Sequence, residues 1–205
     1  MPVGTYGTVK AMAPEELQAM GVEIVLGNTF HLWLRPGTEI IAAHGDLHDF
    51  MHWEGPILTD SGGYQVFSLR SLMRIDDEGV TLRSHVDGSL HTLTPRRVMA
   101  VQAALGSDIA MAFDECLPAK ADRARVTPSV DRTARWAERS KQAHEGNPAA
   151  LFGIVQGGMY EGLRDQSLKG LTDIGFFDVD SLGNIIIANH KSKEHYIFLL
   201  QNEVR

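Results

Sequence analysis

The chain has 205 residues, of which 43% are hydrophobic and 22% are charged, and its formal net charge at pH 7 is −7. That balance is typical of a globular protein, and it argues against one that coats nucleic acid without sequence preference. No stretch approaches the ~20 apolar residues that span a bilayer. The single cysteine, Cys116, excludes an internal disulfide, and MPVGTYGTVKAM lacks a basic, apolar leader, so we expect a cytoplasmic protein without a membrane partner.

Short apolar strands and helical stretches alternate from the start of the chain, which is the pattern of βα units around a parallel sheet. Residues 14–20 predict a first helix, because a proline and two acids open it. Residues 23–32 (EIVLGNTFHL) predict a buried strand that ends in Asn28 and His31, and residues 38–44 predict the next helix.

The segment LTDSGGYQVFS, residues 58–68, is the most informative part of the chain. An apolar run leads into Asp60, two glycines allow the backbone to approach a ligand closely, and Tyr64 offers a flat face for a planar ring. This pattern predicts a parallel strand whose tip holds a carboxylate over a small ligand. Taken alone, the segment also fits an ordinary strand followed by a glycine-rich turn.

Residues 74–95 interrupt the alternation of strands and helices. Asp-Glu-Gly and Asp-Gly turns separate short alternating runs there, which predicts an inserted β-hairpin. Helical spacing then predicts a helix from Pro95 and two more over residues 129–144 and 160–174.

Polar side chains close several of the predicted strands. SDIAMAFDEC ends on Asp114 and Glu115, ALFGIVQGG contains Gln156, and Asn28 and Asp60 close the two earlier strands. In a (β/α)8 barrel the carboxyl ends of all strands point to one face, which holds the active site. We therefore predict an α/β fold of the TIM-barrel type in which these groups share one mouth. Acids that only cap the following helices are the alternative.

One helical stretch is rich in basic residues. They can contact phosphates, or they can form a solvated face balanced by Asp122, Asp131 and Glu138, and the sequence favours the second interpretation. The basic residues are Arg123, Arg125, Arg132, Arg135, Arg139 and Lys141.

The composition changes after residue 176. Residues 177–205 hold three of the five asparagines, and all the prolines lie before them. The shift predicts a divergent tail, for instance one that arose by a frameshift or a fusion. A natural but slightly unusual final strand and helix is the alternative.

Five strings together closely resemble the bacterial tRNA-guanine transglycosylases, the queuine (or preQ1) tRNA-ribosyltransferases. They are MPVGTYGTVKAM, LGNTFHLWLRPG, LTDSGGYQVFSL, GSDIAMAFDEC and FGIVQGG. The resemblance implies that residues 1–176 form an incomplete TIM barrel with an inserted hairpin, holding five or six of the eight βα units. It implies exchange of guanine for a 7-deazaguanine, preQ1 or queuine, at the anticodon wobble position in queuosine biosynthesis.

The resemblance also implies roles for individual residues. The base-binding segment would consist of Asp60, Ser61, Gly62, Gly63 and Tyr64. Within it, Asp60 would be the catalytic carboxylate that handles protons, and Tyr64 would stack on the purine. Asp114 would accept hydrogen bonds from the N–H groups of the base, and Gln156 would read its carbonyl side. The residues expected to line the same pocket are Asn28 and Cys116.

The chain departs from the family pattern at both ends. The family has further sequence before MPVGTYG, and after the stretch that matches Phe176 it continues into a region with the nucleophilic aspartate, tRNA contacts and a structural zinc held by three cysteines and a histidine. We find no family string after Phe176, and one cysteine cannot build that zinc site, so no metal or cofactor is expected. The implied partners are a tRNA anticodon loop and a guanine-like base, and the complete family is implied to form a homodimer.

Two alternatives to an active transglycosylase stay open. The first is a gene relic or base-binding module that keeps the pocket without turnover, which the missing nucleophile favours. The second is an unrelated barrel glycosidase that uses Asp60 and Asp114 as its pair of carboxylates.

Overall fold

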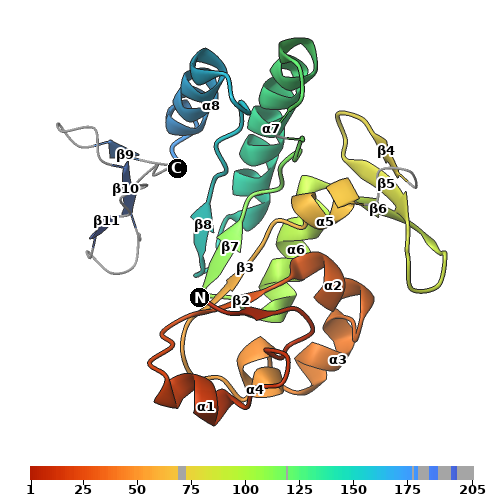
Figure 1. Cartoon of the computed structure of the whole chain (residues 1–205), viewed down its shortest axis with the longest axis vertical. Helices are drawn as coiled ribbons and strands as arrows, with labels where there is room; N and C mark the ends of the chain where they lie inside the picture. Colours follow the sequence, from red (N-terminus) through yellow and green to blue (C-terminus); the bar gives the residue numbers. More distant parts are fainter. Residues whose placement is uncertain (69–72, 119, 177, 180–184, 189–194, 198–205) are drawn as a thin grey trace.

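A five-stranded parallel sheet lies at the centre of the molecule (Figure 1). The computed structural model describes residues 1–68, 73–118, 120–176, 178–179, 185–188 and 195–197. The strands of the sheet are β1 (Val3–Gly4), β2 (Val25–Gly27), β3 (Ile57–Thr59), β7 (Ile109–Met111) and β8 (Ala150–Phe152). They lie in sequence order, and every neighbouring pair is parallel. All their carboxyl ends therefore meet at one edge.

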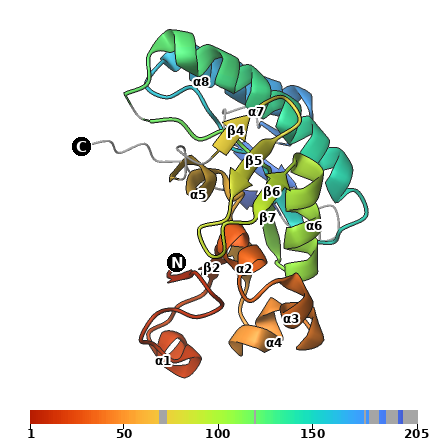
Figure 2. The same cartoon turned by 90° about the vertical axis from the view of Figure 1, so that its right-hand side faces the viewer.

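Helices connect these strands and pack one against the next. They are α1 (Pro14–Ala19), α2 (Thr29–Leu34), α3 (Thr38–Ala43), α4 (Leu47–Met51), α5 (Gly63–Ser68), α6 (Pro95–Leu105), α7 (Arg123–His144) and α8 (Glu161–Asp173). Contacts run from α3 to α6, from α6 to α7 and from α7 to α8, as Figure 2 also shows. The predicted α/β class is thus confirmed. Among the described residues, no helix has the length and apolar character needed to cross a bilayer.

The strand predicted over residues 23–32 is much shorter in the structure. It ends at Gly27, and the chain turns at Asn28 into helix α2, so His31 is helical. Two apolar residues that follow, Phe30 and Leu32, are almost fully buried, and they pack into two different hydrophobic clusters. A mixed apolar and polar run of this length is compatible with a strand or a helix, and the packing of these two side chains decided between them.

Helix α7 begins earlier than predicted. The sequence placed its start at residue 129, after Pro128, but the helix begins at Arg123 and contains that proline. Asp122 caps it by accepting a hydrogen bond from the backbone N–H of Arg125 at 2.8 Å, and Val126 is buried in the extra turn. The cap and the burial outweigh the hydrogen bond that Pro128 cannot donate.

A small antiparallel sheet follows α5 and stands beside the parallel sheet (Figures 1 and 2). Its strands are β4 (Met73–Ile75), β5 (Val80–Arg83) and β6 (Leu90–Leu93), paired in sequence order. The segment 74–95 thus contains three strands and two turns. We call β4, β5 and β6 the inserted sheet.

Three short antiparallel strands lie in the segment 177–205. They are β9 (Asp178–Val179), β10 (Ile185–Ala188) and β11 (His195–Ile197). The other residues of the predicted tail lie outside the described residues.

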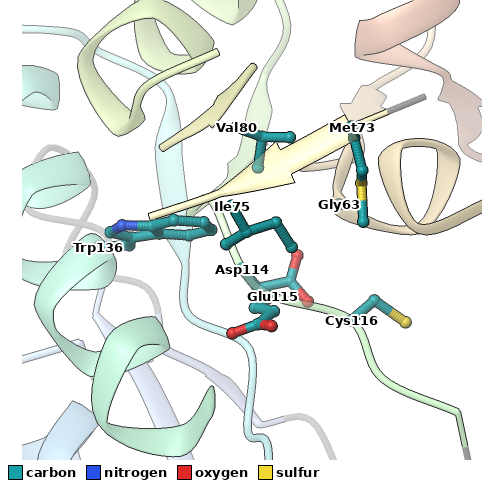
Figure 3. Close-up of a pocket in the computed structure, with 8 residues that line it drawn as sticks. All are labelled: Gly63, Met73, Ile75, Val80, Asp114, Glu115, Cys116 and Trp136. Carbon is teal, nitrogen blue, oxygen red and sulfur yellow. The ribbon is translucent and has the colours of Figure 1, made fainter. Parts of the chain in front are cut away.

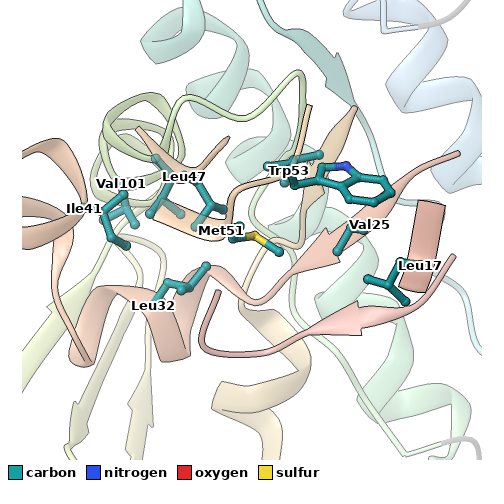
Figure 4. Packing of buried hydrophobic residues seen from close by; sticks show 10 residues of the cluster. Leu17, Val25, Leu32, Ile41, Leu47, Met51, Trp53 and Val101 are labelled. Atoms are coloured by element: carbon teal, nitrogen blue, oxygen red, sulfur yellow. The ribbon is translucent and has the colours of Figure 1, made fainter. Parts of the chain in front are cut away.

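Buried apolar side chains form two main clusters. One lies between the amino-terminal strands and helices α1 to α4, where Leu47, Met51 and Trp53 meet Val25 and Leu17 (Figure 4). The other lies beneath the inserted sheet and contains Phe113 stacked on Trp136, with ring centroids 4.7 Å apart and planes 9° apart. This second cluster joins the inserted sheet to α7 and to the chain that leaves β7.

A buried glutamine of α6 ties β7 to the core. The Gln102 amide donates to the carbonyl of Met111 and accepts from the N–H of Met111, each at 2.9 Å, so it pairs both backbone groups of that residue. Its oxygen also accepts from the Thr59 hydroxyl at 2.9 Å. The side chain thus occupies the position that a neighbouring strand would otherwise take.

Replacing Gln102 with Leu should lower the free energy of unfolding by about 2–4 kcal/mol, because the buried N–H and C=O of Met111 lose their partners. Chemical denaturation monitored by circular dichroism measures the loss. The control is Gln142→Leu, at an exposed position of α7, which should change stability by no more than about 0.5 kcal/mol. Equal effects of the two substitutions would contradict the assignment.

Candidate functional site

The carboxyl edge of the parallel sheet brings together side chains from four strand ends. Asn28 follows β2, Asp60 follows β3, Asp114 lies three residues after β7, and Gln156 follows β8. Asn28 donates to Asp60 at 2.5 Å, and Gln156 donates to Asp114 at 2.7 Å. Four polar residues that are far apart in the sequence thus lie in one connected region.

The Asp60 carboxylate is held by four hydrogen bonds. One oxygen accepts from the side chains of Asn28 and Gln65, the second at 2.8 Å. The other oxygen accepts from the backbone N–H groups of Thr29 at 2.9 Å and Gly62 at 3.2 Å. Burial raises the pKa of Asp60, and these hydrogen bonds oppose the rise. The arrangement holds a partly buried carboxyl group whose affinity for a proton is increased.

Asp114 is buried next to Asp60 and is held by two polar side chains. The Ser61 hydroxyl donates to one oxygen at 2.5 Å, and the Gln156 amide donates to the other at 2.7 Å. Burial raises the pKa of Asp114 to about 6; the negative charge of Asp60 adds to the rise, and the hydrogen bond from Ser61 opposes it. Near neutral pH this group therefore presents an ionised acceptor that is easily protonated.

The glycines of the Ser-Gly-Gly turn allow the two acids to approach each other. A Cβ atom at Gly63 would lie 2.4 Å from an Asp114 carboxylate oxygen and 2.7 Å from the carbonyl oxygen of the same residue. Gly62 has a φ of 78°, in the left-handed region that side chains disfavour. The close approach that the structure shows is therefore made to Asp114, and the predicted approach of this backbone to a ligand stays a prediction.

A small pocket opens beside Asp114, as Figure 3 shows. Gly63, Asp114, Glu115 and Cys116 line it from the parallel sheet and its connections. The Cys116 thiol is half-buried, and burial together with the Asp114 charge raises its pKa. The wall opposite these residues consists of Met73, Ile75, Val80 and Trp136.

Tyr64 differs from the other predicted site residues in its exposure. It is the second residue of α5, directly after Gly63, and 68% of its surface is exposed. It is not among the residues that line the pocket beside Asp114. Its stacking role stays a prediction.

Comparison of the sequence with known proteins places the chain in a family. Residues 1–200 match the family described as queuine tRNA-ribosyltransferase. The chain belongs to that family. The membership removes the alternative of an unrelated barrel glycosidase built on Asp60 and Asp114. The match also extends past Phe176, into the segment where sequence analysis found no family string, so the boundary at residue 176 stays a prediction.

Curated relatives with the name queuine tRNA-ribosyltransferase are similar over most of the chain. The protein from Thioalkalivibrio sulfidiphilus is 61% identical over 197 residues, which is 96% of this chain and 53% of the relative. Those from Marinobacter nauticus and Pseudoalteromonas atlantica are 61% and 62% identical over 191 residues, 93% of this chain and 51% of each relative. The chain thus spans about half the length of the curated relatives it matches.

Sequence reasoning missed three polar residues beside Asp60. Thr29 and Gln65 bond directly to its carboxylate, while the His31 ring lies edge-on to Tyr6 and His85, with centroids 5.4 and 5.8 Å away. Burial lowers the pKa of His31, His85 lowers it further, and the Asp60 charge opposes both effects. For Thr29 and His31, the sequence signal was the spacing of the polar residues in NTFH, which becomes visible only when the segment is read as a helix.

Four of the basic residues of α7 pair with groups on other elements, which corrects the acidic partners predicted for them. Arg125 and Arg132 bind the carboxylate of Glu115 at 2.7 and 2.5 Å. Arg135 binds Asp77, in the turn between β4 and β5, at 2.7 Å, and Arg139 donates to the backbone of Asp77 at 2.6 Å. The expected partners, Asp122, Asp131 and Glu138, lie on the same helix or at its cap, whereas the observed acids come from the inserted sheet and from the end of β7.

The absence of the zinc site that the family resemblance implies stays a prediction. The chain has one cysteine, and among the residues that the structure describes no group of three or more His, Cys, Asp or Glu side chains is arranged to hold a metal ion. Cys116 lies in the pocket beside Asp114.

Replacing Gly63 with Ala should lower the free energy of unfolding by about 1–3 kcal/mol, because the new methyl group overlaps Asp114. Thermal and chemical unfolding measure the change. Gly162→Ala is the matched control, since nothing lies within 4 Å of a Cβ atom at that position in α8. The control should leave stability unchanged or raise it by up to about 1 kcal/mol. A stable Gly63→Ala variant would refute the close approach.

Proposed function

We propose that this chain carries the base-recognition part of a tRNA-guanine transglycosylase, which exchanges guanine for preQ1 or queuine at the anticodon wobble position in queuosine biosynthesis. The observation that carries the proposal is the buried Asp114 carboxylate, held by Ser61 and Gln156 next to Asp60. The substrates are taken to be a tRNA anticodon loop and a guanine-like base, as the names of the relatives suggest.

We also propose that the parallel sheet is part of a (β/α)8 barrel with the inserted sheet at its mouth. The strand order β1-β2-β3-β7-β8 follows the sequence, and helices between the strands pack in the same order, as in such a barrel. The site lies at the carboxyl ends of the strands, where active sites of this fold occur.

The acceptor geometry of Asp114 suits the edge of guanine. The base presents its N1–H and exocyclic amino group side by side, and a carboxylate accepts both in bidentate fashion. In the structure one Asp114 oxygen accepts from Gln156. A base that takes this oxygen releases the Gln156 amide, which can then donate to the carbonyl at position 6 of the base.

Asp60 is suited to proton handling because it is a partly buried carboxyl group with a raised pKa. Exchange of a base requires proton transfer at the departing and arriving rings, and the base has to leave its stack in the anticodon loop to reach a pocket. The exposed Tyr64 ring, one residue beyond Gly63, offers a surface on which such a base can stack.

Guanine binding should depend on the charge of Asp114. As the pH falls through about 6, the carboxylate gains a proton and stops accepting, so guanine affinity should fall. Titration calorimetry from pH 5 to 8 measures the profile. Asp114→Asn should bind about 2–5 kcal/mol more weakly at neutral pH and should lose the pH dependence near 6. The control Asp173→Asn removes an exposed acid of α8 and should behave like the wild type. Unchanged affinity in the Asp114 variant would refute the proposal.

We further propose that the 205 residues bind the base without completing the exchange, as a base-binding module would. The support is twofold. The chain covers 51–53% of the length of its relatives, and its one cysteine cannot supply the three cysteine ligands of the zinc site that the resemblance implies. The test is incorporation of labelled guanine into an unmodified tRNA with a GUN anticodon, beside a full-length relative. We expect guanine binding without incorporation. Incorporation at the relative's rate would overturn this part of the proposal.

A further inference from the structure

Glu115 lines the pocket together with its chain neighbours Asp114 and Cys116. Its carboxylate is bound by arginine side chains of α7. Only 1% of the Glu115 side chain is exposed. A buried carboxylate is costly unless ionic partners and hydrogen bonds compensate for the lost water.

All the partners that hold Glu115 come from one face of α7. Its two carboxylate oxygens bind Arg125 at 2.7 Å and Arg132 at 2.5 Å. Its backbone N–H donates to the Thr133 hydroxyl at 3.1 Å, and its carbonyl accepts from the Ser129 hydroxyl at 3.2 Å. Side chain and backbone of this residue are thus fixed together by a single rigid element.

The same helix holds the opposite wall of the pocket. Arg132, which binds Glu115, also approaches the Asp77 carboxylate at 3.5 Å, and Trp136 donates to the Asp77 carbonyl at 2.8 Å. Asp77 lies between β4 and β5, whose residues Met73, Ile75 and Val80 line the pocket. Arg132 therefore links the two walls of the pocket, because it pairs with Glu115 on one side and with Asp77 of the inserted sheet on the other.

We propose that Glu115 and Arg132 are positioning residues that set the direction of the Asp114 carboxylate and its distance from the inserted sheet, and so determine the preference for a base with a 2-amino group. The inference rests on the proposed function for its ligand and on the contacts of α7 for its geometry. Both residues act through the backbone that carries Asp114 and Cys116.

The test compares Glu115→Gln with Glu138→Gln. The second substitution removes an exposed carboxylate from α7, the helix that holds Glu115. Calorimetry gives the affinities for guanine and for hypoxanthine, which lacks the 2-amino group. In Glu115→Gln we expect guanine affinity to fall by at least about tenfold, as a displaced contact would cause, while hypoxanthine affinity falls less. A merely structural role would lower both affinities equally. The control should keep the wild-type ratio.

The only cysteine of the chain gives a second measurement that needs no base. Cys116 directly follows Glu115 in the chain, so loss of the contacts of Glu115 should make the Cys116 thiol react faster with iodoacetamide. Mass spectrometry of the intact protein measures the rate of alkylation. We expect the rise in Glu115→Gln and not in Glu138→Gln. If Glu115→Gln fails to fold, Arg132→Lys replaces it, since it keeps the charge but loses the planar two-pronged contact.

The outcomes separate the two proposals. An unchanged ratio of the two affinities together with an unchanged alkylation rate overturns the positioning role. If the wild-type chain binds neither base, the proposed function fails, and the alkylation rates alone then decide whether Glu115 positions the pocket residues.

Discussion

Two carboxyl groups removed from water, one buried and one partly buried at the same sheet edge, are the constraint on which the rest of the site depends. Asp60 and Asp114 each lose hydration, and the charge of one makes ionisation of the other less favourable. Hydrogen bonds from Asn28, Ser61 and Gln156 offset part of that cost. A site of this kind is stable only if its donors are held in place, so the elements around it serve mainly to fix positions.

The elements that hold these donors use different physical means. At the Ser-Gly-Gly turn, the absence of a side chain at Gly63 leaves room for an Asp114 oxygen. At α7, arginine side chains neutralise the buried Glu115 and reach the inserted sheet. The first device works by size and the second by charge.

Much of the site was predictable because a parallel sheet gathers the carboxyl ends of its strands. Asn28, Asp60, Asp114 and Gln156 stand at such ends, and the structure joins them in pairs. The ion pairs of Glu115 were not predictable, since its arginine partners lie on a separate helix whose position against Glu115 depends on the fold. The pairing of Asp77 with Arg135 was also hidden, because residues so far apart in the chain carry no local signal of contact.

Local ambiguity explains the error at residues 23–32. The apolar run fits a long strand as well as a short strand followed by a helix, and only burial of Phe30 and Leu32 against their neighbours separates the two. The neighbours expected for Thr29 and His31 differ between the strand and the helix. Family strings identify the chemistry of such a segment more readily than its geometry, because they record which residues are present and not how the backbone turns.

The Gln102 amide has a consequence for the shape of the sheet edge. The ladder between β3 and β7 ends at Thr59 and Ala110, and the next residue of β7, Met111, is paired by this side chain from α6. Asp60 still donates its N–H to Gly27 on the other side. The glutamine therefore acts as a substitute rung that lets β3 and β7 diverge without leaving backbone groups unpaired. The separation of β3 and β7 at their carboxyl ends is thus stabilised by Gln102 of α6, a residue that does not line the pocket.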